Sequence, residues 1–379
     1  MIKVKNKIIL IGLLFLSLIL IYSSSGQIND SIENVAVIID SSEFYDTSYV
    51  NDVLNAFEYI NETYNIDYDH FILTNYSNVN PSPYKVTYYF NNSATNHTEL
   101  AKSLISSDKY DMIILIGYEL RRGFLDVTEY PDTNFMFYDL SGQTPGYSIQ
   151  NIPSNLIVIS FKENQVGFIA GTLASAIFEN FPDKVGIIGT YQGDSRSRQL
   201  IGGFQSAILR NYSDTEILIS FINDWINDST AENIGSTFST NGYGLVFSAL
   251  QNNNSLGVRK GFSGQSIISV DTNRSYSITK NNTKTLLYMF NEFNRTGFIG
   301  GTTVTFGLED NVFIPTDWGD TEMVNSTMAK LYNEIVVNEL PIPNDIVYAS
   351  NTYGFEGLSL ISAFFLYLSA NRWILRKKR

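Results

Sequence analysis

The feature that most constrains the fold is a short apolar run, usually closed by Gly or an acid, that recurs along the chain. Segments with the apolar spacing of an α-helix separate these runs. Strands that alternate with helices in this way form parallel sheets with helices on both faces, so we predict an α/β fold. The predicted strands are 34–40, 110–117, 134–139, 156–161, 184–189, 244–249 and 266–271, and the predicted helices include 53–60, 98–106, 164–178, 200–209 and 230–237.

The length of the chain favours two lobes. A chain of 379 residues, of which 44% are apolar and 14% aromatic, has enough material for two compact cores. No low-complexity linker divides the body, so we expect strands that cross between the lobes. In open parallel sheets ligands bind outside the carboxyl ends of the strands, so the acids that close the predicted strands are the first candidates for ligand contacts.

Charge and cysteine content exclude several classes of site. A formal net charge of -13 disfavours nucleic acid as a partner, because binding to phosphates depends on clustered Lys and Arg. The chain has no cysteine. This excludes disulfides, thiol nucleophiles, thiolate metal sites and the acylated cysteine of a bacterial lipoprotein.

The amino-terminal end, residues 1–26, has the layout of an export signal. Three lysines lie within the first seven residues, and an apolar stretch at 8–22 is followed by small polar residues. A cleaved signal peptide and an uncleaved signal anchor both fit this layout. Either form would place the following chain outside the cytoplasm.

The carboxyl-terminal end predicts a second membrane contact. Residues 357–375 are mostly apolar and are followed by a basic cluster at 376–379, which the positive-inside rule would keep in the cytoplasm. We expect a transmembrane anchor that contacts membrane lipid here, with an interfacial amphipathic helix as the alternative. The expected location is therefore the cell membrane, with an extracellular body. Such tethering suits a cell without an outer membrane, and we expect an archaeal source.

Asn-x-Ser/Thr triplets in the body are N-glycosylation acceptors, and a glycoprotein would fit an extracellular location. A chain this rich in Asn, Ser and Thr also contains some of these triplets by chance. They begin at Asn61, Asn75, Asn91, Asn96, Asn211, Asn227, Asn253, Asn273, Asn281, Asn294 and Asn325.

The chain contains few of the residues and motifs that common enzyme active sites require. His70 and His97 are the only histidines, and we expect both to be solvated because their neighbours are polar. A His-based metal site or a Ser-His-Asp triad is therefore disfavoured. The chain also lacks the glycine-rich loops of ATPases and of dinucleotide enzymes. We expect no cofactor, no metal and no catalytic activity.

Several blocks in a fixed order resemble the basic membrane protein family of ABC-transporter substrate-binding proteins, whose best-known members are nucleoside receptors. The longest block is FKENQVGFIAGTLASA at 161–176. The others are YPDTNFMFYD at 130–139, KVGIIG at 184–189, GGF at 202–204 and FGLED at 306–310. Together they cover the chain from about Asn34 to about Glu339.

This resemblance implies the type I periplasmic-binding-protein fold, in which two doubly wound, Rossmann-like lobes are joined by a hinge and enclose a ligand cleft. We expect lobe 1 at 34–160 and lobe 2 at 161–272. Residues 273–345 should then supply crossover segments that complete both lobes.

The resemblance also implies an aromatic sandwich for a purine. The family's first-loop motif, Asp-x-Ser-Phe-Asn, aligns with Asp46-Thr-Ser-Tyr-Val50, which places Asp46 in the site and Tyr49 at the stacking position. Val50 replaces an Asn that resembles a base-edge hydrogen-bonding group. Trp225 falls where the family has its second aromatic face, and lobe packing is its alternative role. Stacking on an aromatic ring is worth about 1–3 kcal/mol per base.

The remaining implied contacts are polar. Asp139 matches a strand-end acid that accepts from the base, with a helix cap as its alternative role. Asp271 resembles the family's ribose-binding acid, since a carboxylate can accept hydrogen bonds from a diol. The family's Leu-Thr-Ser-x-x-Lys motif is altered here, so the ribose lysine is Lys280, Lys284 or missing, and we favour Lys284.

Two functions of different classes follow. The first is capture of a nucleoside, or of a related small polar ring compound, for delivery to an ABC permease with a separate ATPase. The second is a sensor ectodomain that signals through a partner. A nucleoside hydrolase is disfavoured, because the Asp-rich amino terminus of such enzymes is missing.

Overall fold

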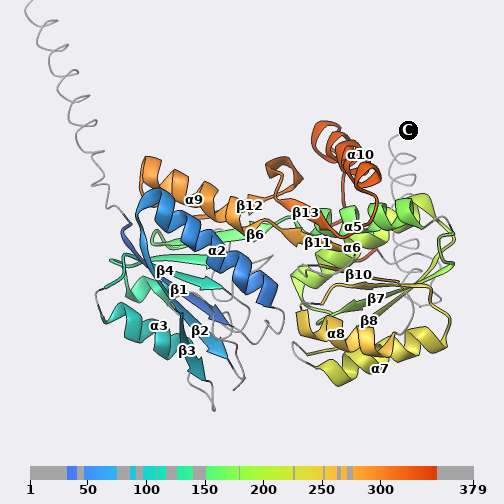
Figure 1. The fold of residues 1–379 in the computed structure, drawn as a ribbon, viewed down its shortest axis with the longest axis horizontal. Helices are drawn as coiled ribbons and strands as arrows, with labels where there is room; N and C mark the ends of the chain where they lie inside the picture. Colours follow the sequence, from blue (N-terminus) through green and yellow to red (C-terminus); the bar gives the residue numbers. More distant parts are fainter. Residues whose placement is uncertain are drawn as a thin grey trace, which may run out of the picture.

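The computed structural model describes two α/β lobes that lie side by side (Figure 1). Each lobe is built on one mainly parallel sheet, so the predicted fold class is confirmed. The described residues are 32–40, 47–74, 86–90, 97–107, 109–116, 126–139, 151–178, 180–224, 227–250, 252–262, 266–270 and 276–347.

Lobe 1 contains a sheet in which every pair of neighbouring strands runs parallel. Its strand order is β12-β6-β5-β4-β1-β2-β3. The strands are β1 (Asn34–Asp40), β2 (Asp67–Thr74), β3 (Val86–Phe90), β4 (Met112–Ile116), β5 (Asn134–Tyr138), β6 (Leu156–Phe161) and β12 (Thr302–Phe306). Helices α2 (Thr47–Tyr64), α3 (His97–Ile105) and α9 (Asn282–Thr296) and the short η2 (Val127–Glu129) accompany this sheet.

Lobe 2 contains a sheet of order β13-β11-β10-β9-β7-β8, in which only β11 and β13 pair antiparallel. Its strands are β7 (Lys184–Gly189), β8 (Glu216–Phe221), β9 (Leu245–Ser248), β10 (Ser266–Val270), β11 (Ser277–Lys280) and β13 (Phe313–Thr316). Its helices are α5 (Glu163–Ile177), α6 (Ser195–Asn211), α7 (Asp228–Thr240), α8 (Asn252–Gly261), α10 (Thr321–Tyr332), and the short η3 (Leu308–Asp310) and η4 (Asn333–Val337).

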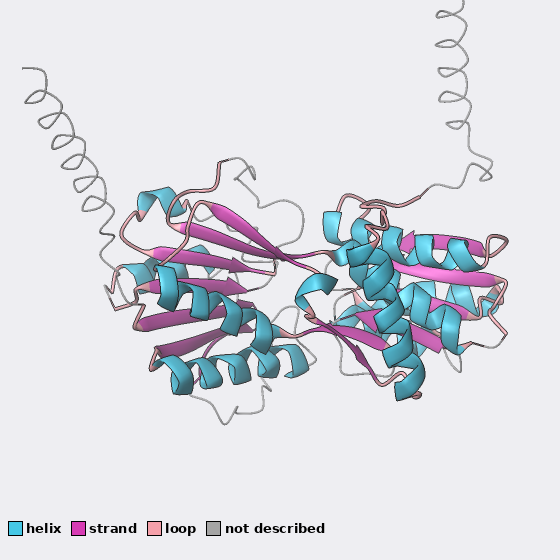
Figure 2. Ribbon diagram, turned by 90° about the horizontal axis from the view of Figure 1, so that it is seen from above, coloured by secondary structure: helices cyan, strands magenta, loops and turns pink. Residues whose placement is uncertain are grey.

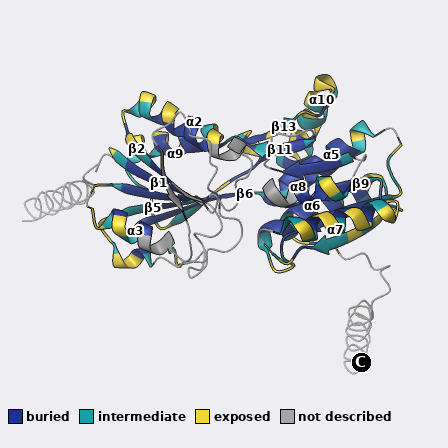
Figure 3. Cartoon of the chain, turned by 60° about the horizontal axis from the view of Figure 1, so that its bottom comes forward, coloured by how far each residue is buried: buried dark blue, intermediate teal, exposed yellow. Residues whose placement is uncertain are grey.

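Burial follows the apolar pattern of the sequence. Strands β4 and β6 are buried along their whole length, because helices cover both faces of the sheet. One apolar cluster continues from lobe 1 into lobe 2, and each lobe has a second, smaller cluster of its own. Figure 3 shows the buried strands inside and the exposed residues on the outer faces of the helices.

Helices α5 and α6 approach so closely that their backbones touch. A Cβ atom added at Gly167 would lie 2.0 Å from the carbonyl oxygen of Leu200, and one at Gly203 would lie 2.0 Å from that of Asn164. Only glycine fits at these two positions. The close approach fixes the first turns of α5 and α6 relative to each other.

Within its described part the chain crosses between the lobes three times, and Figure 2 shows the region where these segments pass. The chain passes from β6 to α5, from β11 to α9, and from β12 through η3 to β13. We call these segments, residues 161–163, 280–282 and 306–313, the hinge. Backbone hydrogen bonds join them, from Lys162 N to Phe306 O at 2.8 Å and from Asn281 N to Val312 O at 2.8 Å.

The predicted tethering of the chain to a membrane requires a correction. No helix in the described part of the chain is long and apolar enough to span a membrane. The predicted anchor at 357–375, the basic tail at 376–379 and the export segment at 1–26 all lie outside the described residues. A cell-membrane location through a C-terminal transmembrane helix, with its contact to lipid, is therefore not supported.

The predicted solvation of His70 is also wrong. This side chain is 1% exposed, and it packs edge-on against Phe57 and Tyr68 at ring-centroid distances of 5.7 and 4.7 Å. Neither ring nitrogen has a hydrogen-bond partner among the residues that the structure describes. Burial lowers the pKa of His70 to about 3, against a weaker opposing effect of Asp69. The prediction was wrong because residues near His70 in the sequence are polar, although His70 itself occupies an inward-facing position on β2.

Buried neutral His70 predicts a loss of stability in acid. Between its unfolded pKa near 6.5 and its folded pKa of about 3, only the unfolded chain binds the proton, so stability falls as pH falls through this window. The loss is about 1.4 kcal/mol per pH unit. We expect His70→Leu to remove this pH dependence. The difference in the free energy of unfolding between the variant and the wild type should therefore change by about 2–3 kcal/mol between pH 7 and pH 4.5. Urea unfolding at the two pH values measures this difference. If the stability of the variant and of the wild type changes equally with pH, the prediction is wrong.

Candidate functional site

Asp139 lies directly after β5, at the carboxyl edge of the lobe 1 sheet. Its backbone has a positive φ of 61°, a left-handed conformation that residues other than glycine adopt at a cost. Its side chain is 8% exposed. A buried carboxylate on a strained strand end needs a charged partner, since an unpaired buried charge is strongly unfavourable.

Lys280 supplies that partner from the hinge. It is the last residue of β11 and is only 2% exposed. Its Nζ donates to Asp139 Oδ1 at 2.8 Å and to Glu163 Oε1 at 2.7 Å. The same ammonium lies 4.7 Å from the ring centroid of Phe161, a distance that gives a cation–π attraction.

Glu163 completes the arrangement from lobe 2. It is the first residue of α5 and is fully buried, and its Oε1 also accepts from Nε of Arg196 at 3.0 Å. Arg196 lies in the first turn of α6, where the N-cap Asp194 accepts from its backbone N–H. We call Asp139, Glu163, Arg196 and Lys280 the hinge ion cluster.

The hinge ion cluster joins the two lobes through one ammonium group. Asp139 belongs to the lobe 1 sheet, Glu163 begins a lobe 2 helix, and Lys280 lies between them. Carboxylates and ammonium groups at a strand edge can accept from and donate to a polar solute. Among the described residues, no group of three or more His, Asp or Glu side chains could hold a metal ion.

The two candidate lysines have different surroundings. Lys284 is exposed on α9, where its Nζ donates to the carbonyl oxygen of Asn311 at 3.2 Å. Lys280 is buried beside Asp139. The structure therefore brings Lys280 and Asp139 together and leaves Lys284 away from them.

Asp46, Trp225 and Asp271 lie outside the described residues, as does the side chain of Tyr49, whose backbone is in the first turn of α2.

Sequence reasoning missed Glu163 and Arg196. One signal for the cluster was available, since Ser277-Ile-Thr-Lys280 has the Ser-x-x-Lys spacing of the family motif and Lys284 does not. Glu163 lies within the longest matching block, but nothing local indicated a partner more than a hundred residues away.

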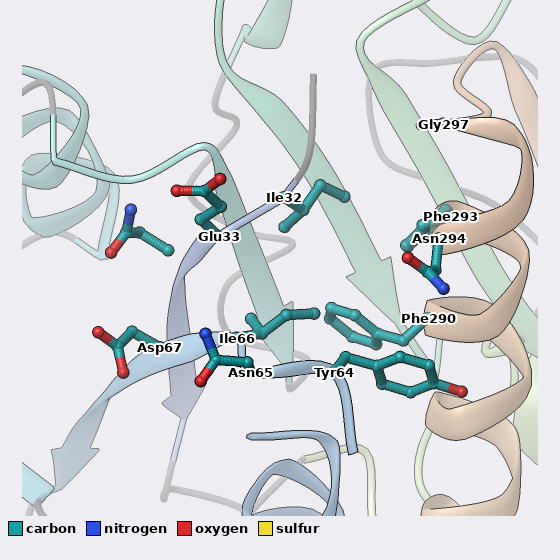
Figure 4. A pocket seen from close by; sticks show the side chains of 11 residues that line it. Ile32, Glu33, Tyr64, Asn65, Ile66, Asp67, Phe290, Phe293, Asn294 and Gly297 are labelled. Atoms are coloured by element: carbon teal, nitrogen blue, oxygen red, sulfur yellow. The ribbon is translucent and has the colours of Figure 1, made fainter. Parts of the chain in front are cut away.

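A separate pocket of about 460 Å³ lies at the other end of the lobe 1 sheet, beside the amino-terminal ends of its strands (Figure 4). It is lined by the apolar side chains of Ile66, Phe290 and Phe293 and by the acidic residues Glu33 and Asp67. These residues belong to the amino-terminal ends of β1 and β2 and to α9, whereas Asp139 follows the carboxyl end of a parallel strand. The pocket is therefore not part of the hinge ion cluster.

The two lobes, each on a mainly parallel sheet and joined by the hinge, have the type I fold of periplasmic solute-binding proteins. The family model described as ABC transporter substrate-binding protein, PnrA-like, matches residues 32–345. The chain belongs to this family, as its sequence blocks predicted.

Curated relatives agree with this assignment. Basic membrane protein A of Borreliella burgdorferi is 24% identical over 359 residues, which are 90% of this chain and 96% of the relative. Basic membrane protein A1 of Borrelia garinii is 23% identical over 89% of this chain and 96% of its own length. These relatives are bacterial, and the expected archaeal source is not supported.

Solved structures share the fold at low identity. A solute-binding protein of an ABC transporter system from Aeropyrum pernix has a TM-score of 0.61 at 14% identity, covering 84% of this chain and 95% of its own. A periplasmic solute-binding protein from Actinobacillus succinogenes with bound D-allose has a TM-score of 0.53 at 15% identity, covering 78% and 99%.

Substitutions of Lys280 and Lys284 should have different effects on stability. Lys280→Met leaves two buried carboxylates without their shared cation, so we expect a loss of about 3–5 kcal/mol in the free energy of unfolding. Lys284→Met, the matched control on the exposed face of α9, should change it by less than about 0.5 kcal/mol. Urea unfolding at neutral pH measures both. Equal losses would show that Lys280 is not in a buried ion cluster.

Proposed function

We propose that this substrate-binding protein captures a purine nucleoside, or a related small polar ring compound, between its two lobes. The observation that carries the proposal is the ion pair of Asp139 and Lys280, which places opposite charges at the carboxyl edge of the lobe 1 sheet beside the hinge. Such edges are where open parallel sheets bind ligands. The family match supports capture of a solute, and the choice of a nucleoside rests on the resemblance of the site residues to the family pattern.

In this proposal, Tyr49 and Trp225 stack on the two faces of the base. Asp139 and Asp46 accept from donors on the base, and Asp271 accepts from the ribose hydroxyls. Lys280, rather than Lys284, donates to the sugar, because only Lys280 lies beside Asp139. A nucleoside can stack its base on both aromatic rings and donate its ribose hydroxyls to a carboxylate. A free sugar has no base to stack, so these contacts favour a nucleoside.

The partners in this proposal are an ABC permease and its separate ATPase, which the family description implies. Capture would take place outside the cytoplasm, where substrate-binding proteins of this family act. A sensor ectodomain of the same fold is not favoured, because the family match is to substrate-binding proteins of transporters. The proposed role is binding without catalysis.

A solute panel tests the proposal. We expect adenosine, inosine or guanosine to raise the melting temperature of the full-length protein, because a ligand that binds only the folded state stabilises it. The gain is about 2.7 kcal/mol at a concentration of about 100 Kd. D-ribose and D-allose should give a smaller shift. Differential scanning fluorimetry at fixed protein concentration measures these shifts.

Substitutions connect the shift to the proposed residues. Asp139→Asn and Asp271→Ala should abolish the nucleoside shift, and Lys284→Met, the matched control, should retain it. If no nucleoside shifts the melting temperature while another metabolite does, the ligand class is wrong although the family remains. If Asp139→Asn keeps the full shift, Asp139 is not part of the site.

A further inference from the structure

Glu163, like Lys280, makes two of the contacts that form the hinge ion cluster. It is fully buried, and one of its oxygens, Oε1, accepts from both Lys280 Nζ and Arg196 Nε. The other oxygen, Oε2, is buried and has no hydrogen-bond partner among the described residues. Both of these cations are therefore held by the same oxygen atom.

The backbone around Glu163 holds this anchor rigidly. Glu163 lies in the first turn of α5, where the helix dipole favours a negative charge. The contact at Gly167 and Gly203 fixes α5 against α6, which carries Arg196. A lysine side chain, by contrast, loses about 2 kcal/mol of rotamer freedom when it is fixed in one position. Lys280 therefore needs an external anchor in order to point its ammonium at Asp139.

We propose that Glu163 is the positioning residue that holds the ammonium of Lys280 against Asp139, and that it sets solute affinity through Lys280 without touching the solute. This inference rests on the proposed function, because it assigns Lys280 to the solute site. The chain of contacts runs from Arg196 through Glu163 and Lys280 to Asp139, which is from lobe 2 across the hinge to lobe 1.

A second ion pair in the hinge provides a matched control. Lys162 and Glu309 join the first and third crossings, and both side chains are partly exposed. This pair contacts neither Lys280 nor Asp139 in the described structure. Glu309→Gln therefore removes a hinge ion pair of the same chemical type without removing the anchor of Lys280.

The first experiment reads the position of Lys280 without any solute. Full-length protein is treated with an amine-acylating reagent, and the modified lysines are quantified by mass spectrometry. In the wild type, buried Lys280 should react far more slowly than exposed Lys284. Glu163→Gln should increase the reactivity of Lys280 severalfold and leave that of Lys284 unchanged, whereas Glu309→Gln should change neither. If Glu163→Gln does not fold, Glu163→Asp is measured instead, since the shorter carboxylate cannot hold the ammonium at the same place.

The second experiment reads solute affinity by calorimetric titration with inosine. We expect Glu163→Gln to weaken binding by about tenfold to a hundredfold, the usual loss for a hydrogen bond to a charged group. The loss should disappear when Glu163→Gln is introduced into a Lys280→Gln background, because Glu163 acts only through Lys280. Glu309→Gln should bind as the wild type does.

The outcomes separate this inference from the proposed function. Unchanged reactivity of Lys280 in Glu163→Gln overturns the positioning role, whatever the solute. A loss of affinity that persists in the Lys280→Gln background also overturns it, because Glu163 would then act on the solute by another route. If the wild type binds no nucleoside, the proposed function fails, and the reactivity of Lys280 still decides whether Glu163 positions it.

Discussion

The structure depends on one ammonium group that lies between two buried carboxylates at the hinge. Lys280 joins Asp139 of lobe 1 to Glu163 of lobe 2, and all three residues are at most 7% exposed. Buried charges are tolerated only when they are paired and hydrogen-bonded, so removal of one partner leaves the others strongly destabilised. The same interaction therefore links the two lobes and sets the charge pattern at the strand ends.

The rest of lobe 2 supports this interaction through close packing. Glycines at 167 and 203 let α5 and α6 meet backbone to backbone, which brings the first turns of both helices, and with them Glu163 and Arg196, to the hinge. An apolar cluster continues from lobe 1 into lobe 2, and the charged residues of the hinge are buried. In such surroundings ionic hydrogen bonds are stronger than in water, so a rigid scaffold and a strong ion cluster reinforce each other.

The sequence predicted the fold well, because buried strands of a parallel sheet are continuous apolar runs that need no tertiary knowledge to recognise. The site was harder to predict. Lys280 and Lys284 are four residues apart in similar surroundings, and only the turn from β11 into α9 makes one buried and the other exposed. The partners of Glu163 are distant in the chain and leave no local pattern. His70 was misread for a related reason, since a single inward position on β2 is hidden among polar neighbours.

The most direct test of the account is a crystal structure of the protein grown with inosine. The account predicts one inosine between the lobes, with hydrogen bonds to Asp139 and Lys280 and with Glu163 still bound to Lys280. Inosine bound only in the pocket lined by Ile66 and Phe290, at the other end of the lobe 1 sheet, would contradict it.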